Sequence, residues 1–204
     1  MSRTSLSIVV AMTGILLAGC QKAPTDQLAT TQTALEQARA AEADKYAPDA
    51  FSKAQTSFSG AADEITAQDQ AFFLTRDYSK ANQLLTDALA ELQTAQTEAV
   101  ANKETAKQEV ETLTTETEAA IQAAQTALLK APRGKDTKAE IEAMKADLDA
   151  TSAALAEARD MYSRGDYLGA KASLTQSKGK AEAVSSEVET AMQKVRGARR
   201  PAGR

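Results

Sequence analysis

Hydrophobic positions along the chain recur at alternating spacings of three and four residues, the pattern of helices that pack along a shared seam. One such run is Phe51, Ala54, Phe58, Ala61, Ile65, Gln68 and Phe72. A second run with the same spacing is Ile141, Met144, Leu148, Thr151, Leu155, Ala158 and Tyr162. Both runs predict amphipathic helices, and the chain is predicted to be all-α.

Proline and glycine mark the ends of these helices. Neither occurs between Ala61 and Ala131, so an uninterrupted helix is expected there. Pro48 fits the first turn of a helix, where a missing N–H costs little. Asp77 and Asp166 fit N-caps, because a carboxylate accepts hydrogen bonds from the free N–H groups of the first turn. Five helices are predicted, at residues 25–46, 48–74, 77–130, 137–163 and 166–196.

The two seams indicate an internal duplication. Each residue of the first run lies 90 positions before its counterpart in the second. After a one-residue deletion the match continues, with Asp77-Tyr78 corresponding to Asp166-Tyr167. Short connections make neighbouring helices antiparallel. We therefore predict an elongated antiparallel bundle of two three-helix, spectrin-like repeats, 28–105 and 106–196, that share one long central helix and meet near 96–107, where its seam is weakest.

The composition limits the catalytic and metal-binding chemistry available to the chain. The chain has no His, no Trp and one Cys, and its formal charge is −4. Without an imidazole, and without a free thiol when its single Cys is modified, it lacks the usual general base, the usual nucleophile and the usual transition-metal ligands. We expect no enzyme activity, no metal and no cofactor, and the mild acidity argues against nucleic acid as a partner.

The first nineteen residues have the layout of an export signal. Arg3 precedes an apolar stretch from Leu6 to Leu17, and the small residues Ala18 and Gly19 follow. The apolar stretch is shorter than the roughly 20 residues that a membrane-spanning helix needs. Residues 1–19 are therefore predicted to be a signal peptide.

The run Leu17-Ala18-Gly19-Cys20 resembles the lipobox of bacterial lipoproteins. That resemblance implies cleavage between Gly19 and Cys20, a diacylglycerol thioether on Cys20 and an acyl chain on its new amino group. Two or three acyl chains hold a protein firmly at a bilayer, and residues 20–27 would be the lipid-anchored linker. The alternative is an ordinary signal peptide followed by an incidental or structural cysteine, although a single Cys forms no internal disulfide.

Residues around the first seam suggest a more specific family. The run Tyr46-Ala47-Pro48, followed by Phe51 and Ala54, resembles the alanine-rich envelope lipoproteins that carry an uncharacterised Tyr-Ala-Pro helical domain. The likeness covers roughly residues 28–100 and is less exact in the second copy. It implies an envelope location and brings no catalytic residues. By analogy with lipoprotein sorting, Gln21 in place of Asp favours the outer membrane and a periplasm-facing chain.

Three groups of polar residues have both a functional and a structural interpretation. The acidic residues Glu109, Glu111, Glu116 and Glu118 attract cations or form a solvated helix face, and the second interpretation is favoured. Arg164-Gly165-Asp166 spells an adhesion tripeptide but fits a helix-to-helix turn better. The basic residues of the tail are expected to form an anionic-surface contact or a solubilising end; they are Lys194, Arg196, Arg199, Arg200 and Arg204, and residues 197–204 are expected to be disordered.

Aromatic residues gather near the predicted bundle ends. Most are expected to cap the core, and Phe73 is the candidate for a partner groove. The set consists of Tyr46, Phe72, Phe73, Tyr78, Tyr162 and Tyr167.

The sequence favours a structural or adaptor lipoprotein that contacts envelope proteins or peptidoglycan through its helical faces. The alternative is a binding module that holds a wall glycan or a small ligand in a groove between helices. A core filled by alanines favours the first function, and a groove with convergent polar groups and free aromatics favours the second.

Overall fold

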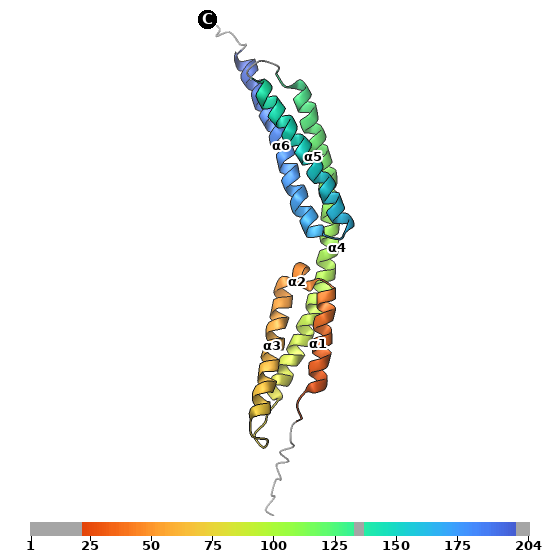
Figure 1. The fold of residues 1–204 in the computed structure, drawn as a ribbon, viewed down its shortest axis with the longest axis vertical. Coiled ribbons are helices and arrows are strands. Elements are labelled where there is room, and N and C mark those ends of the chain that lie inside the picture. The colour runs from red at the N-terminus through yellow and green to blue at the C-terminus, as the bar shows by residue number, and fades with distance from the viewer. Residues whose placement is uncertain (1–21, 133–136, 199–204) are drawn as a thin grey trace, which may run out of the picture. The chain divides into compact units, whose positions relative to one another are not determined.

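The structure, a computed structural model, describes residues 22–132 and 137–198. Within these ranges the secondary structure is helical, with no strand, so the all-α prediction is confirmed (Figure 1). The helices are α1 (Thr25–Ala40), α2 (Ala43–Tyr46), α3 (Pro48–Gln70), α4 (Ser79–Lys130), α5 (Lys138–Ser163) and α6 (Tyr167–Ala198).

The chain divides into two compact units, Met1–Thr97 and Glu98–Arg204. The first contains α1, α2, α3 and the beginning of α4, and the second contains the remainder of α4 with α5 and α6. The division falls inside the segment 96–107, where the seam of α4 carries its least apolar side chains. Because α4 contributes to both units, a single helix supplies one wall of each core.

The core of the first unit consists mainly of small side chains around a few large ones. Leu35 of α1, Phe51 of α3 and Leu85 of α4 are buried. Between them lie alanines that are fully buried, which allow the helix backbones to approach closely. These alanines are Ala38, Ala54, Ala61, Ala81, Ala88 and Ala95.

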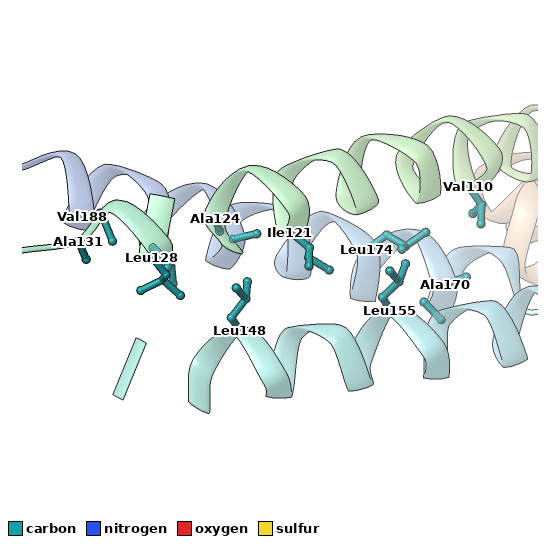
Figure 2. Packing of buried hydrophobic residues seen from close by; sticks show 13 residues of the cluster. Val110, Ile121, Ala124, Leu128, Ala131, Leu148, Leu155, Ala170, Leu174 and Val188 are labelled. Atoms are coloured by element: carbon teal, nitrogen blue, oxygen red, sulfur yellow. The ribbon is translucent and has the colours of Figure 1, made fainter. Parts of the chain in front are cut away.

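The core of the second unit is built in the same way and is seen in Figure 2. Val110 and Ile121 of α4 face Leu148 and Leu155 of α5, and Leu174 of α6 completes the cluster. One buried polar residue crosses between helices, since the hydroxyl of Thr117 lies 3.4 Å from the carbonyl oxygen of Leu174.

The prediction of one continuous helix over residues 25–46 is wrong. It is interrupted after Ala40, and Glu42 adopts a left-handed backbone with φ of 57° before the short helix α2 begins. A left-handed conformation costs a non-glycine residue roughly 1 kcal/mol. The bend places Ala43 and Tyr46 in the core, and that burial offsets the cost. All residues around the break are acceptable in helices, so the pattern gave no sign of it.

The second predicted helix, 48–74, also ends early. α3 stops at Gln70, and Ala71 is extended with ψ of 158°. Phe72, expected in the seam, is instead 62% exposed. Its counterpart in the second seam, Tyr162, remains inside α5. The other helix boundaries lie within two residues of the predicted ones.

Candidate functional site

Several of the predicted site residues lie outside the described part of the chain. Gly19 and Cys20 of the lipobox do, as do Arg199, Arg200 and Arg204 of the basic tail. Lys194 lies in α6 and is exposed, whereas the side chain of Arg196 is not described. The lipidation site and most of the tail therefore stay predictions.

Pro48 occupies the first position of α3. The buried residue Ala47 precedes it as the N-cap, and its carbonyl oxygen accepts the N–H of Phe51 at 3.0 Å. The fixed backbone of proline suits this position, so the tight turn between α2 and α3 follows directly from the Ala47-Pro48 pair.

The cap predicted at Asp77 lies one residue too early. α4 begins at Ser79, and the carbonyl of Tyr78 accepts the N–H of Asn82 at 2.8 Å, which makes Tyr78 the N-cap. The Asp77 carboxylate still accepts the N–H of Ser79 at 2.9 Å. Hydrogen bonds from the Ser79 side chain and backbone lower the pKa of Asp77.

Arg164-Gly165-Asp166 forms the connection between α5 and α6. Gly165 has φ of 81° and donates its N–H to Tyr162, while Asp166 donates to Met161 at 2.9 Å. These two bonds close the C-terminus of α5 as a Schellman motif. The Asp166 carboxylate then accepts the N–H of Gly169 at 3.0 Å and caps α6. The tripeptide is fully engaged in the turn.

The four glutamates of the acidic cluster each have a partner on a neighbouring helix. Glu109 pairs with Lys171 at 2.5 Å and Glu116 with Lys178 at 2.8 Å, both on α6. The two remaining glutamates contact α5 on the other side of the seam. Glu111 accepts a hydrogen bond from the Tyr162 hydroxyl, and Glu118 forms an ion pair with Arg159. The cluster is therefore a double row of contacts that align α4 with both neighbours.

The described residues hold no group of three or more His, Cys, Asp or Glu side chains arranged for a metal ion.

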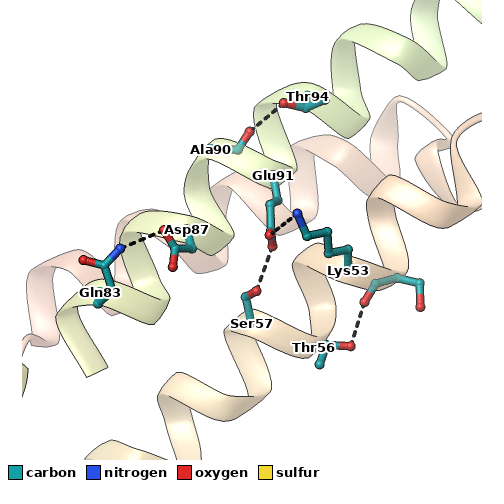
Figure 3. Close-up of polar contacts among 9 residues, drawn as sticks. Lys53, Thr56, Ser57, Gln83, Asp87, Ala90, Glu91 and Thr94 are labelled. Atoms are coloured by element: carbon teal, nitrogen blue, oxygen red, sulfur yellow. Dashed lines mark hydrogen bonds and ion pairs between the residues drawn. The ribbon is translucent and has the colours of Figure 1, made fainter. Parts of the chain in front are cut away.

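In the first unit, Glu91 of α4 also contacts a neighbouring helix. Its carboxylate accepts a hydrogen bond from Ser57 at 2.8 Å and pairs with Lys53 at 3.1 Å, both on α3 (Figure 3). Charged side chains in both units thus serve mainly to join helices.

The aromatic residues fall into two groups. Tyr46 and Tyr78 are buried in the first unit, and the rings of Tyr162 and Tyr167 lie 5.3 Å apart in the second. In contrast, Phe73 is 55% exposed, and its ring lies 4.8 Å from that of Phe72. No lining residue of the described pockets is Phe72 or Phe73, so the structure does not place Phe73 in a groove.

Among the described residues of the first unit, the exposed large hydrophobic side chains lie in the connection between α3 and α4. Phe72, Phe73 and Leu74 are consecutive, and all three side chains are more than half exposed. We call residues 71–75 the apolar loop. The sequence signal was available, because three successive bulky apolar residues exceed what one helical stripe can bury.

Hydrogen bonds hold both ends of this loop. Arg76 donates to the carbonyl oxygens of Asp69 at 2.7 Å and Ala71 at 3.1 Å, which satisfies free acceptors at the end of α3. Tyr78 donates to the Asp69 carboxylate at 2.5 Å, and this bond raises the pKa of Tyr78. Gln68 accepts the N–H of Asp77 at 3.0 Å. The loop therefore has a defined base from which its apolar tip extends.

Glu64 strengthens the same base. Its carboxylate pairs with Lys80 of α4 at 2.7 Å and accepts from Gln68 at 2.8 Å. Hydrogen bonds from Lys80 and then Gln68 lower the pKa of Glu64. One acidic side chain thus connects the end of α3 with the start of α4.

The start of α1 lies beside the same end of the unit. The side-chain amide of Gln27 donates to the carbonyl of Asn82 at 3.3 Å and to the hydroxyl of Thr86 at 3.0 Å, both in the opening turns of α4. Figure 1 shows the beginning of α1 and the loop after α3 at one end of the unit, with α2 at the other. The N-terminal segment therefore enters the fold next to the apolar loop.

A groove of about 550 Å³ lies between the end of α4 and the start of α5. Leu128, Ile141 and Leu148 form its floor, the exposed Leu129 stands at its edge, and Lys138, Glu142, Lys145 and Asp149 contribute charged groups. None of its lining residues is aromatic. The spacing of apolar residues in the sequence does not mark this groove.

No protein-family model, curated protein or solved structure matches this chain. Among the helices in the described ranges, none combines the length and the hydropathy required to cross a bilayer. The proposed function is therefore derived from the residues of this chain.

Proposed function

We propose that this protein is a bacterial envelope lipoprotein, held at a membrane by acylated Cys20, that acts as a structural spacer or adaptor. The lipobox run ending at Cys20 is the observation that carries the placement. The diacylglycerol thioether requires a thiol, and Cys20 carries the only one in the chain. The outer membrane is the favoured location, by the analogy drawn from Gln21.

The helical units support the spacer role. Their cores are filled by the chain's own side chains, and every buried side-chain nitrogen or oxygen in the described residues has a hydrogen-bond partner. A buried and unsatisfied polar group would indicate a missing ligand. Ion pairs between helices, such as Glu116 with Lys178, align the helices and leave no unpaired charged group inside the described core.

We also propose that the two units are copies of one ancestral spectrin-like repeat. Corresponding positions have the same environment, since Ala81 and Ala170 are fully buried, as are Leu85 and Leu174.

Photocrosslinking in intact cells tests the adaptor role. A photoreactive residue at Gln55 or Lys180, both exposed on helical faces, should give discrete protein adducts that mass spectrometry identifies. The same residue at Leu129, at the edge of the groove, is the matched control. Adducts only at Leu129, or none from the helical faces, would contradict the adaptor role.

The groove between α4 and α5 favours the alternative of a binding module. Its floor is apolar and it has no aromatic ring to stack on a sugar, so its chemistry suits an acyl chain or an amphipathic segment better than a wall glycan. An apolar fluorescent probe should bind the wild-type chain and lose affinity in Leu129→Glu. Val100→Glu, at a position exposed outside the groove, is the control, and equal affinity in all three proteins would exclude this function.

The basic tail is proposed to contact an anionic surface such as phospholipid heads, lipopolysaccharide or peptidoglycan carboxylates. Deleting residues 197–204 should reduce pelleting with anionic vesicles or purified cell wall. Unchanged pelleting would assign the tail to solubility alone.

A further inference from the structure

The strongest unexplained feature is an apolar surface fixed at one end of the first unit. Phe72, Phe73 and Leu74 are 62%, 55% and 66% exposed. Large adjoining apolar side chains of this kind mark an interaction surface more often than scattered ones do. Because α3 has already ended at Gln70, these residues contribute nothing to the helix seam.

We propose that the apolar loop, residues 71–75, inserts into the bilayer that carries the Cys20 anchor and so fixes how the first unit meets the membrane. This inference rests on the proposed function, because it requires the acylated N-terminus.

The position of the N-terminus selects a membrane as the occupant. α1 begins at Thr25, and its Gln27 contacts Asn82 and Thr86 in the opening turns of α4, directly after the loop. The segment from Cys20 to Thr25 reaches at most about 18 Å. An acylated Cys20 therefore keeps the end of the unit that carries the loop close to the bilayer surface.

The chemistry of the loop suits the bilayer interface. Residues 71–75 carry no charge. The carbonyl of Phe72 accepts from the N–H of Thr75 at 2.8 Å and from its hydroxyl at 2.9 Å, and the carbonyl of Ala71 accepts from Arg76. Backbone groups that are satisfied internally lower the cost of entering an apolar medium.

The contacts at the base of the loop also favour insertion of residues 71–75 as one unit. Arg76 closes the end of α3, Tyr78 is joined to Asp69, and Lys80 is joined to Glu64. Charged residues that are held by these contacts therefore flank the uncharged residues 71–75. Apolar side chains placed in this way enter roughly 5–10 Å into the interface, which leaves the charged groups at the lipid heads.

Depth-dependent quenching tests the proposal on the full lipidated chain. Since Cys20 is the only cysteine and its thiol is consumed by acylation, Phe73→Cys provides a single labelling site. Ser52→Cys, exposed near the start of α3 at the opposite end of the unit, is the matched control. Each protein carries an environment-sensitive fluorophore and is reconstituted into phosphatidylethanolamine–phosphatidylglycerol vesicles that contain brominated acyl chains.

The expected result is a blue-shifted emission that bromine quenches for the label at position 73, with no quenching at position 52. Equal, unquenched emission at both positions on an acylated chain would overturn the proposed insertion of the loop without contradicting the acylation of Cys20. A blue-shifted label at position 73 that bromine does not quench, on a chain that self-associates, would also overturn it, in favour of a protein contact. The acyl mass on Cys20, read from the same sample, shows separately whether the proposed anchor exists.

A loop variant supplies a second measurement. Replacing Phe72, Phe73 and Leu74 with serine in the chain acylated at Cys20 should weaken binding to these vesicles by about tenfold or more. The exposed positions predict an unchanged helical circular dichroism signal. Equal vesicle binding with and without the three serines would contradict insertion.

Discussion

The phenolic hydroxyl of Tyr162 on α5 donates a hydrogen bond to the carboxylate of Glu111 on α4. This contact joins two helices of the second unit at the edge of their core. It raises the pKa of Tyr162 to about 12, with the hydrogen bond as the largest cause and burial next. The residue that closes the end of the seam is therefore also a titratable reporter of helix packing.

The pH dependence follows from that shift. The ordinary tyrosine pKa is 10.0, so between about pH 10 and 12 the folded state holds this proton more tightly than the unfolded state does. The stabilising contribution is complete below pH 10 and is lost as the pH rises towards 12. Tyr162→Phe should therefore show a smaller fall in unfolding free energy across this interval. Identical pH profiles for the two proteins in denaturant titrations would contradict the assignment.

The cap of α6 predicts an unusual glycine effect. A Cβ at Gly169 would lie 2.3 Å from the Asp166 carboxylate, whereas a Cβ at Gly179 would meet nothing within 4 Å. Gly179→Ala should stabilise the protein by about 0.8 kcal/mol through helix propensity. Gly169→Ala should instead displace the capping carboxylate, and the loss of that cap, about 1 kcal/mol, should cancel the gain from helix propensity.

A double-mutant cycle isolates this contact. Once Asp166→Ala has removed the carboxylate, Gly169→Ala should become stabilising, as at Gly179. Thermal unfolding of the four proteins measures the coupling. Additive effects would show that the carboxylate is not the group that the new methyl displaces.

Buried leucines at corresponding positions of the two units predict equivalent losses of stability. Leu85 and Leu174 are both fully buried, so Leu→Ala at either should cost about 2–5 kcal/mol. Hydrogen exchange should rise mainly in the unit that contains the substitution. Leu129→Ala, at a side chain that is 76% exposed, should change stability by less than about 0.5 kcal/mol. Equal exchange in both units after either core substitution would contradict separate cores.

The heptad pattern predicted most of the helical structure. Phe51, Ala54 and Ala61 are buried as their spacing requires, and so are Leu148, Leu155 and Ala158 in the second seam. Such positions can be predicted because the burial of a helix face depends on local periodicity.

Two helix ends depend on contacts that spacing does not reveal. α3 ends where Arg76 reaches back to the carbonyls of Asp69 and Ala71. The break at Glu42 occurs within residues that all tolerate a helix, and it brings Tyr46 into the core. In both places a tertiary contact outweighs local propensity.

Candidate sites were predicted unevenly for the same reason. The turn at Gly165 and Asp166 is encoded in adjacent residues, so the structural interpretation of that tripeptide could be made from sequence. The proximity of Gln27 to Asn82 across 55 positions could not, and it is this contact that places the start of α1 at the end of the unit that carries the apolar loop.

Lipidation of Cys20 is the claim on which the proposed function depends, and mass spectrometry of the N-terminal peptide tests it most directly. For the chain expressed in a bacterial host, we expect a peptide that begins at Cys20 and carries the masses of diacylglycerol and an acyl chain, in the membrane fraction. Cys20→Ser should yield no acylated peptide and should leave that fraction. An unmodified thiol at Cys20, or membrane recovery unchanged by the serine, would contradict the account.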